Sequence, residues 1–177
     1  MIALAMALAA ASGGPAPRLV YCHMMECTWS KPVSNVAIRS TPAGTLRKVV
    51  ARYGTSVHRD DYPSRYSPST RIRWEKAPNV DYVFCSRRQP ALAFRGTPPG
   101  MGTRQDWTAH ALDLFNLAGY NTASAVIYLR ACHGVDLYRD DIDKALRSLG
   151  YRPGTRSEQV YISGPEQLFN LPPRPKG

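Results

Sequence analysis

A break in pattern near the middle of the chain constrains its fold more than any other feature. Residues 95–103 read Arg-Gly-Thr-Pro-Pro-Gly-Met-Gly-Thr, and this density of Gly and Pro interrupts any regular element. Before the segment, short β-favouring stretches alternate with turn residues; after it, apolar residues recur at helical spacing. We therefore predict an α+β fold with a small antiparallel β-domain over 18–95, a linker over 96–104, a helical segment over 105–165 and an extended tail over 166–177.

The helical segment is predicted to hold three short helices. Residues 103–106, Thr-Arg-Gln-Asp, have the Ser/Thr-x-x-acid pattern of a helix start, and Gly119 would end this first helix. A second helix is predicted over 122–132 and a third over 140–149, each followed by a glycine. In the β-domain, residues 40–44, Ser-Thr-Pro-Ala-Gly, predict a turn.

The N-terminal residues 1–11 are uncharged and apolar, and they are followed by Ser-Gly-Gly-Pro. This pattern is typical of a secretory signal peptide, with Ala9 and Ala11 as the small residues before a cleavage site near Ser12. No charged residue precedes the apolar run, so a buried N-terminal helix is the alternative. Eleven residues fall short of the ~20 that a membrane-spanning helix needs, and we expect no stable membrane insertion.

The chain has four cysteines, an even number that suits two disulfides in an oxidising compartment. Three pairings are possible, and the spacing favours a local Cys22–Cys27 bridge with a longer Cys85–Cys132 bridge. The alternative is a cytosolic zinc site in which these thiolates act with His23 or His133, although only Cys22 and Cys27 approach the spacing of a zinc knuckle.

The chain is strongly basic: 23 Lys and Arg against 13 Asp and Glu give a formal net charge of +10. Such a charge favours anionic partners, and in a secreted or periplasmic protein these are envelope components or a partner protein. The cations are scattered rather than gathered in a run of the kind that binds nucleic acid. The predicted second helix carries Arg130 as its one Lys or Arg, which makes a poor DNA-recognition helix, so nucleic acid is not an expected partner.

A series of short motifs follows the first predicted strand. Residues 35–44 read Asn-Val-Ala-Ile-Arg-Ser-Thr-Pro-Ala-Gly, and Val49-Val50 and Gly54-Thr-Ser-Val57 come after them. The series resembles the bacterial SH3-like (SH3b-type) domain, with Trp74 and Asp81-Tyr82-Val83 at its later Trp and Gly-Trp-Val positions. The resemblance covers residues 33–95 and implies an SH3-like barrel that binds cell-wall or protein ligands without catalysis. The interrupted Gly-Pro-Gly turn departs from that family, and an unrelated antiparallel sheet is the alternative.

Tyrosine and arginine are concentrated between residues 53 and 74, a composition common in binding interfaces. An ordinary small β-domain surface is the alternative. The predicted binding residues are Tyr53, Arg59, Tyr62, Arg65, Tyr66, Arg71 and Trp74.

Catalytic signatures are weak, and the sequence predicts no cofactor and no metal ion. His58 stands near Asp60 and Asp61, which suggests an envelope hydrolase as a second hypothesis, with a solvated polar loop as the alternative. The acidic residues 140–143 fit a helix cap better than a calcium loop. No Gly-x-Ser-x-Gly, P-loop or His-Glu-x-x-His motif is present.

Overall fold

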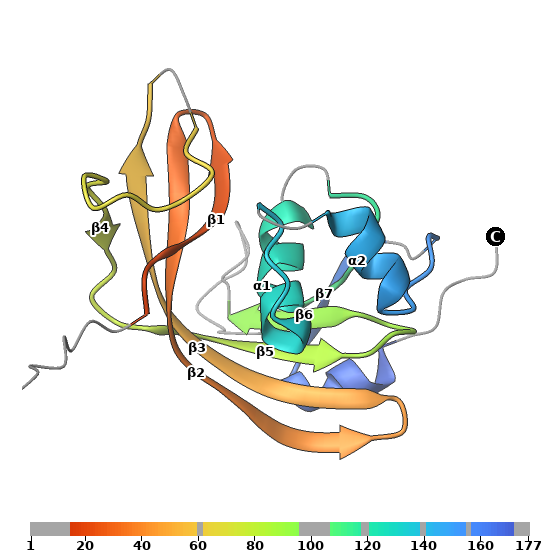
Figure 1. Ribbon diagram of the computed structural model, residues 1–177. Coiled ribbons are helices and arrows are strands. Elements are labelled where there is room, and N and C mark those ends of the chain that lie inside the picture. Colours follow the sequence, from red (N-terminus) through yellow and green to blue (C-terminus); the bar gives the residue numbers. More distant parts are fainter. Residues whose placement is uncertain are drawn as a thin grey trace, which may run out of the picture.

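The computed structural model has an α+β fold built on one open antiparallel sheet. The strand order is β1-β2-β3-β5-β6-β7-β8, with β4 paired to β3 off this path (Figure 1). The structure describes residues 15–59, 62–95, 107–117, 121–138, 141–154 and 157–171. The elements are β1 Arg18–His23, β2 Glu26–Thr41, β3 Gly44–Val57, β4 Arg73–Trp74, β5 Asn79–Cys85, β6 Ala91–Arg95, β7 Trp107–Ala111, α1 Asn121–His133, α2 Ile142–Ser148, β8 Glu158–Ile162 and the 3₁₀ helix η1 Pro165–Asn170.

Strands β2 and β3 form a long bent hairpin that runs through the whole molecule. They are 16 and 14 residues long, and Thr41 pairs with Gly44 across the two-residue loop, which confirms the predicted turn. Gly44 has φ +154°, and a Cβ there would stand 2.6 Å from the carbonyl oxygen of Cys85. The turn therefore accepts only glycine at this position, because β5 passes too close for a side chain.

The two halves of the hairpin belong to different parts of the molecule (Figure 1). In the part that we call the arm, β1 and β4 flank residues 26–32 of β2 and 51–57 of β3. Its core consists of Leu19, Cys27 and Trp29, with half-buried side chains around them. In the rest, which we call the body, β3 pairs with β5 and the sheet continues to β8.

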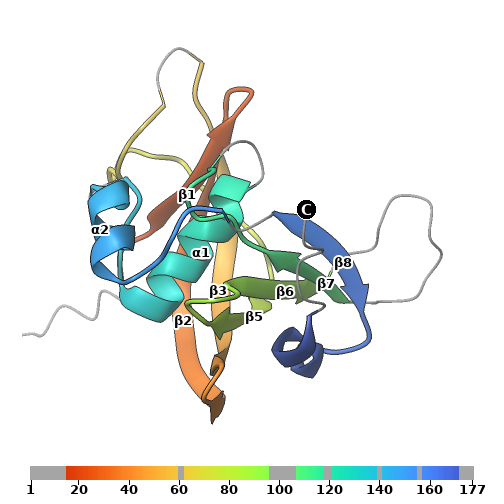
Figure 2. The same ribbon diagram turned by 90° about the vertical axis from the view of Figure 1, so that its right-hand side faces the viewer.

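The body is a three-layer arrangement in which both faces of the sheet are covered. Helices α1 and α2 pack on one face, around Val83, Leu92 and Tyr128. Helix η1 covers the other face, around Phe84 and Leu168 (Figure 2). Burial on both faces makes the central strands almost continuously apolar.

The first predicted helix is wrong, because residues 107–111 form strand β7. This strand alternates between the two covered faces: Trp107 and Ala109 join the core beneath η1, whereas His110 turns toward α1. All of Trp107 to His110 is buried, so the sequence lacks the apolar–polar alternation of an exposed strand and imitates a helical pattern. His110 was expected on a helix and instead lies inside the sheet.

The other two predicted helices are confirmed as α1 and α2. Gly134 follows α1 with φ +69°, and Gly150 follows α2 with φ +82°. The Asp141 carboxylate caps α2 by accepting a hydrogen bond from the backbone N–H of Lys144 at 3.2 Å. The acidic segment at 140–143 thus contains a helix cap, as predicted. No helix among the described residues is long and apolar enough to cross a membrane.

The SH3-like barrel is not formed, because the sheet stays open with β1 and β8 at its ends. Residues 54–57 do not begin a separate element but continue strand β3. Gly54 instead makes room for β4: a Cβ on it would lie 2.7 Å from Ile72 Cγ2 and 2.9 Å from the Arg73 carbonyl oxygen. The glycine thus serves a close strand–strand approach.

Several predictions concern parts of the chain outside the described residues. These are the signal peptide at 1–11, the linker at 96–104, and residues 172–177 of the predicted tail. Residues 166–170, expected to be extended, belong to η1.

Candidate functional site

A groove at the outer end of the arm is the candidate site that overlaps the predicted binding region. Its volume is about 630 Å³, and we call it the arm groove. Strand β3 supplies one wall, and the segment leading into β4 supplies the other. The lining residues are Glu26, Thr55, Ser56, Val57, His58, Ser69, Thr70, Arg71 and Arg73.

The arm groove is lined by two arginines and one glutamate, Glu26, so its formal charge is net positive. Arg71 and Arg73 are exposed and are two residues apart, so they stand on the same side of an extended segment. Neither makes an ion pair with a described residue. The groove also presents the hydroxyl groups of threonine and serine, which suit oxygen-rich anionic ligands.

The floor of the arm groove is fixed by a chain of hydrogen bonds that starts in the arm core. The Trp29 indole N–H donates to Ser56 Oγ at 2.6 Å, and Ser56 Oγ lies 2.8 Å from His58 Nε2. Indole nitrogen can only donate, so Ser56 uses one oxygen lone pair for Trp29 and keeps its proton and its second lone pair for His58 Nε2. The imidazole ring is thereby held in one orientation.

The predicted aromatic binding residues are largely used in packing. The Tyr66 ring meets the edge of Trp29 with centroids 6.1 Å apart, and Trp74 packs against the same arm core. Tyr62 stays exposed, and its hydroxyl accepts a hydrogen bond from the Met25 backbone N–H at 3.0 Å. Arg59 and Arg65 are exposed but do not line the groove.

Tyr53 lies apart from the other predicted binding residues, at the junction of arm and body. Its hydroxyl donates to Asp81 Oδ2 at 2.8 Å. Burial raises the pKa of Tyr53 well above its usual value, with the Asp81 charge adding to the effect. Burial likewise raises the pKa of Asp81, which is 6% exposed, and the Tyr53 hydrogen bond opposes the shift.

Asp81 and Tyr53 also line a hollow of about 620 Å³ beside α1. Lys48 and Arg95 line it too, so cationic and anionic groups share this space. Ser124 of α1 reaches the same hollow, and its Oγ lies 2.9 Å from His110 Nδ1.

His110 is part of a buried chain of polar groups that ties α1 to the sheet. Ser157 Oγ donates to Asn121 Oδ1 at 2.6 Å and lies 2.9 Å from His110 Nε2. Since the Ser157 proton goes to Asn121, His110 Nε2 donates and Nδ1 accepts from Ser124. Burial lowers the pKa of His110, so the ring is held neutral. These hydrogen bonds hold helix α1 against strand β7.

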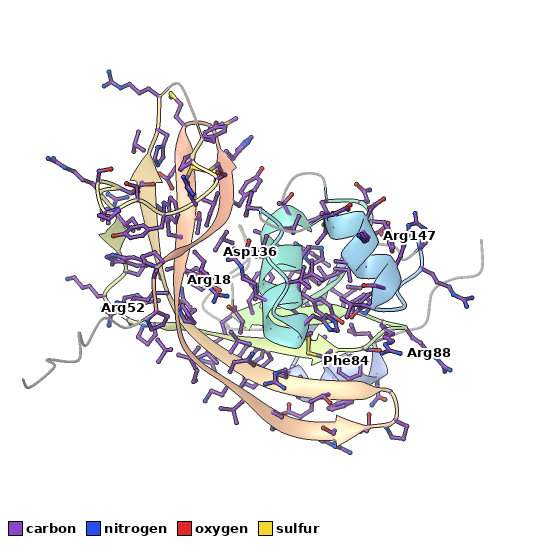
Figure 3. The ribbon with its side chains drawn as sticks, viewed as in Figure 1. Arg18, Arg52, Phe84, Arg88, Asp136 and Arg147 are labelled. Atoms are coloured by element: carbon purple, nitrogen blue, oxygen red, sulfur yellow. A yellow bond between two sulfur atoms is a disulfide. The ribbon has the colours of Figure 1, made fainter. Side chains whose placement is uncertain are left out.

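Arg130 makes a second connection, between α1 and the arm. Its Nη2 donates to the Leu19 carbonyl oxygen at 2.7 Å and to Asp136 Oδ1 at 2.9 Å. The Nε and Nη1 atoms are buried without a hydrogen-bond partner. Figure 3 shows Asp136 beside α1, with the labelled arginines Arg18 and Arg52 on the arm side and Arg88 and Arg147 on the opposite side.

The cysteines pair as the spacing favoured. The structure has Cys22–Cys27 and Cys85–Cys132 disulfides, and the second joins β5 to α1. Sulfurs held in disulfides cannot act as zinc thiolates, so the zinc hypothesis has no ligands in this form. Among the described residues, no group of three or more His, Cys, Asp or Glu side chains could hold a metal ion.

Sequence reasoning missed Arg73, Ser56 and the hydroxyl residues of the groove. Arg73 had a usable signal, because alternation through Arg71-Ile72-Arg73-Trp74 places both arginines on one side. Ser56 gave none, since its role depends on Trp29, 27 residues away. Asp60 and Asp61, the proposed partners of His58, lie outside the described residues.

No family model, curated protein or solved structure matches this chain.

Proposed function

We propose that this protein is a non-catalytic binding protein of an oxidising, extracytoplasmic compartment, and that its arm groove binds an anionic glycan of the cell envelope. The observation that carries the proposal is the groove itself. It has a volume of about 630 Å³, two arginines without an ion-pair partner among the described residues, and several hydroxyl groups.

The surroundings of the arm groove support the same ligand charge. In the part of the hairpin that belongs to the arm, residues 26–32 and 51–57, the charged residues are two cations, Lys31 and Arg52, and one anion, Glu26. An anionic polymer approaching this end of the molecule meets an attractive potential before contact. Two disulfides in the folded chain support an oxidising compartment.

The test is co-sedimentation of the purified protein with insoluble envelope glycan, at several salt concentrations. The R71E/R73E variant should lose at least about tenfold in affinity, since each arginine supplies charge-assisted hydrogen bonds. The matched control R88E/R152E makes the same charge change at exposed sites on the body. Equal loss in both variants would show that only net charge matters, and no sedimentation of the wild type would refute the proposal.

A second candidate, an envelope hydrolase centred on His58, is favoured by one observation. Ser56 Oγ lies 2.8 Å from His58 Nε2, which is the contact expected between a nucleophile and a base. Against it, Ser56 is 4% exposed and its Oγ is also engaged by Trp29. Release of soluble fragments by the wild type, abolished in H58A/D61N, would establish the hydrolase; glycan binding without turnover would exclude it.

A further inference from the structure

The turn between β1 and β2 contains the two most unusual backbone positions of the described chain. Met24 and Met25 have φ +46° and +65°, and they are the only non-glycine residues with positive φ in the parts of the chain that the structure describes. A two-residue hairpin loop of this kind favours Asn-Gly, because a Cβ is disfavoured in the left-handed region. Two long side chains therefore occupy a position that disfavours them.

Both methionine side chains project into solvent. Met24 is 77% exposed and Met25 is 53% exposed. They fill no core, although methionine usually serves as an adaptable core residue. Folding stability thus gives no reason for the Met-Met pair, whereas the thioether groups offer a chemical one.

A disulfide and two hydrogen bonds restrain the turn, although the positive φ angles of its two residues are unfavourable. Cys22 pairs with Cys27 both in the strand register and by a disulfide, directly below the turn. The Met25 N–H donates to the Tyr62 hydroxyl at 3.0 Å, and the Met25 carbonyl oxygen accepts from the His58 N–H at 2.7 Å. The two thioethers are therefore presented on a fixed scaffold.

His58 follows β3, and its backbone lies opposite this turn. Glu26 pairs with Val57, so the next residues outward, Met25 and His58, stand opposite each other. In the tautomer whose Nε2–H donates to the second lone pair of Ser56 Oγ, Nδ1 is unprotonated and can bind a further ligand. Orientation of a ligating histidine through its other nitrogen is a common feature of metal sites.

Thioether sulfur and imidazole nitrogen are a donor set for a soft metal ion, and among biological metals thioethers select Cu(I). All four cysteine sulfurs are in disulfides. In the arm, Met24 and Met25 therefore supply the sulfur atoms that can bind a soft metal ion. We propose that Met24, Met25 and His58 form a binding site for Cu(I) at the tip of the arm.

His23 provides an internal control, because it is next to Met24 in sequence but its side chain belongs to the opposite face of the hairpin from His58. It pairs with Glu26, and its ring stacks on Tyr21 with centroids 6.0 Å apart. Side chains of directly paired residues share a face, so His23 lies with Glu26 and Val57 rather than with His58.

The test is anaerobic titration of the disulfide-intact protein against a chromogenic Cu(I) chelator. We expect the wild type to withdraw one equivalent of Cu(I). M24L/M25L, which keeps side-chain size but removes both thioethers, should weaken binding by at least about tenfold, and H58A should do the same. H23A and M101L should retain the wild-type affinity.

The variant M24N/M25G separates the metal site from folding. Asn-Gly suits the turn better than Met-Met, so its thermal unfolding midpoint should rise while Cu(I) binding is lost. Failure of the wild type to compete with the chelator would overturn the proposal, as would undiminished binding by M24L/M25L. Glycan binding by the arm groove is measured without copper, so the two proposals fail independently.

Discussion

The arm and the body share the same two long strands, yet they are stabilised in different ways. The body buries the sheet on both faces, with large clusters of side chains beneath α1 and η1. The arm has a core cluster of only three buried residues and a disulfide that closes a short loop. Regions with few buried apolar contacts open at lower free energy, so the arm is the part expected to open locally. The candidate binding sites lie on the part with the smaller core.

The largest expected effect tests whether the body depends on its disulfide. Replacing Cys85 and Cys132 with alanine removes a crosslink that spans 47 residues. In the loop-entropy model this lowers the free energy of unfolding by about 4 kcal/mol. Denaturant unfolding monitored by tryptophan fluorescence measures the loss, and a change below about 1 kcal/mol would mean that packing alone secures α1 to the sheet.

Removing the disulfide of the arm should cost less stability, and its effect should be confined to the arm. Replacing Cys22 and Cys27 with alanine opens a loop of sequence separation 5, with an expected loss of about 2 kcal/mol. Hydrogen exchange should accelerate at the amides of β1 and the adjoining part of β2, while β5 and β6 stay protected. Uniform acceleration in both regions would contradict the division into arm and body.

Trp29→Phe keeps an aromatic ring in the arm core but removes the indole N–H and part of the ring volume. Loss of the hydrogen bond to Ser56 should lower the free energy of unfolding by about 1 kcal/mol, with the lost packing adding to this. A double-mutant cycle with Ser56→Ala isolates this bond, because the two changes should not add. Additive losses would show that the contact contributes no stability.

The smallest effect concerns the junction of the two regions. Burial raises the pKa of Asp81 in the folded protein above its unfolded value. The ionised carboxylate therefore opposes folding, and the stability linked to it is present at acidic pH and lost as pH rises through the folded pKa. Asp81→Asn, which keeps an acceptor for Tyr53, should be more stable than the wild type at pH 7.

That gain should shrink as pH falls through the raised folded pKa, and it should be lost below about 4, where the Asp81 carboxyl is protonated in both the folded and the unfolded protein. Denaturant midpoints across pH 3–8 measure it, with the exposed Asp143→Asn as the control. A destabilised Asp81→Asn at pH 7 would indicate that the carboxylate has a cationic partner in solution.

Local signals in the sequence correctly identified the turn at residues 40–44 and the ends of α1 and α2. Proline and glycine at residues 40–44, and the glycines after α1 and α2, act through backbone geometry that neighbouring residues determine. The disulfide pairs also followed from spacing. Strand β7 could not be identified from local signals, because its burial on both faces is created by α1 and η1, which come later in the chain.

The candidate site was predictable only in outline. The concentration of tyrosine and arginine at residues 53–74 pointed to the correct end of the molecule. It could not show that Tyr66 and Trp74 pack on Trp29, since that contact joins residues far apart in sequence. The left-handed Met24 and Met25 gave no sequence signal, because methionine is not typical of such turns.

The arrangement of the disulfides has a consequence for how the chain matures. Along the sequence, the first cysteine bonds to the second and the third to the fourth. When such a chain enters an oxidising space with its N-terminus first, Cys22 and Cys27 can pair before the other two thiols arrive. Cys85 can then pair only with Cys132. Sequential oxidation of this kind yields the native pairing directly, without the reshuffling that crossed or nested bridges require.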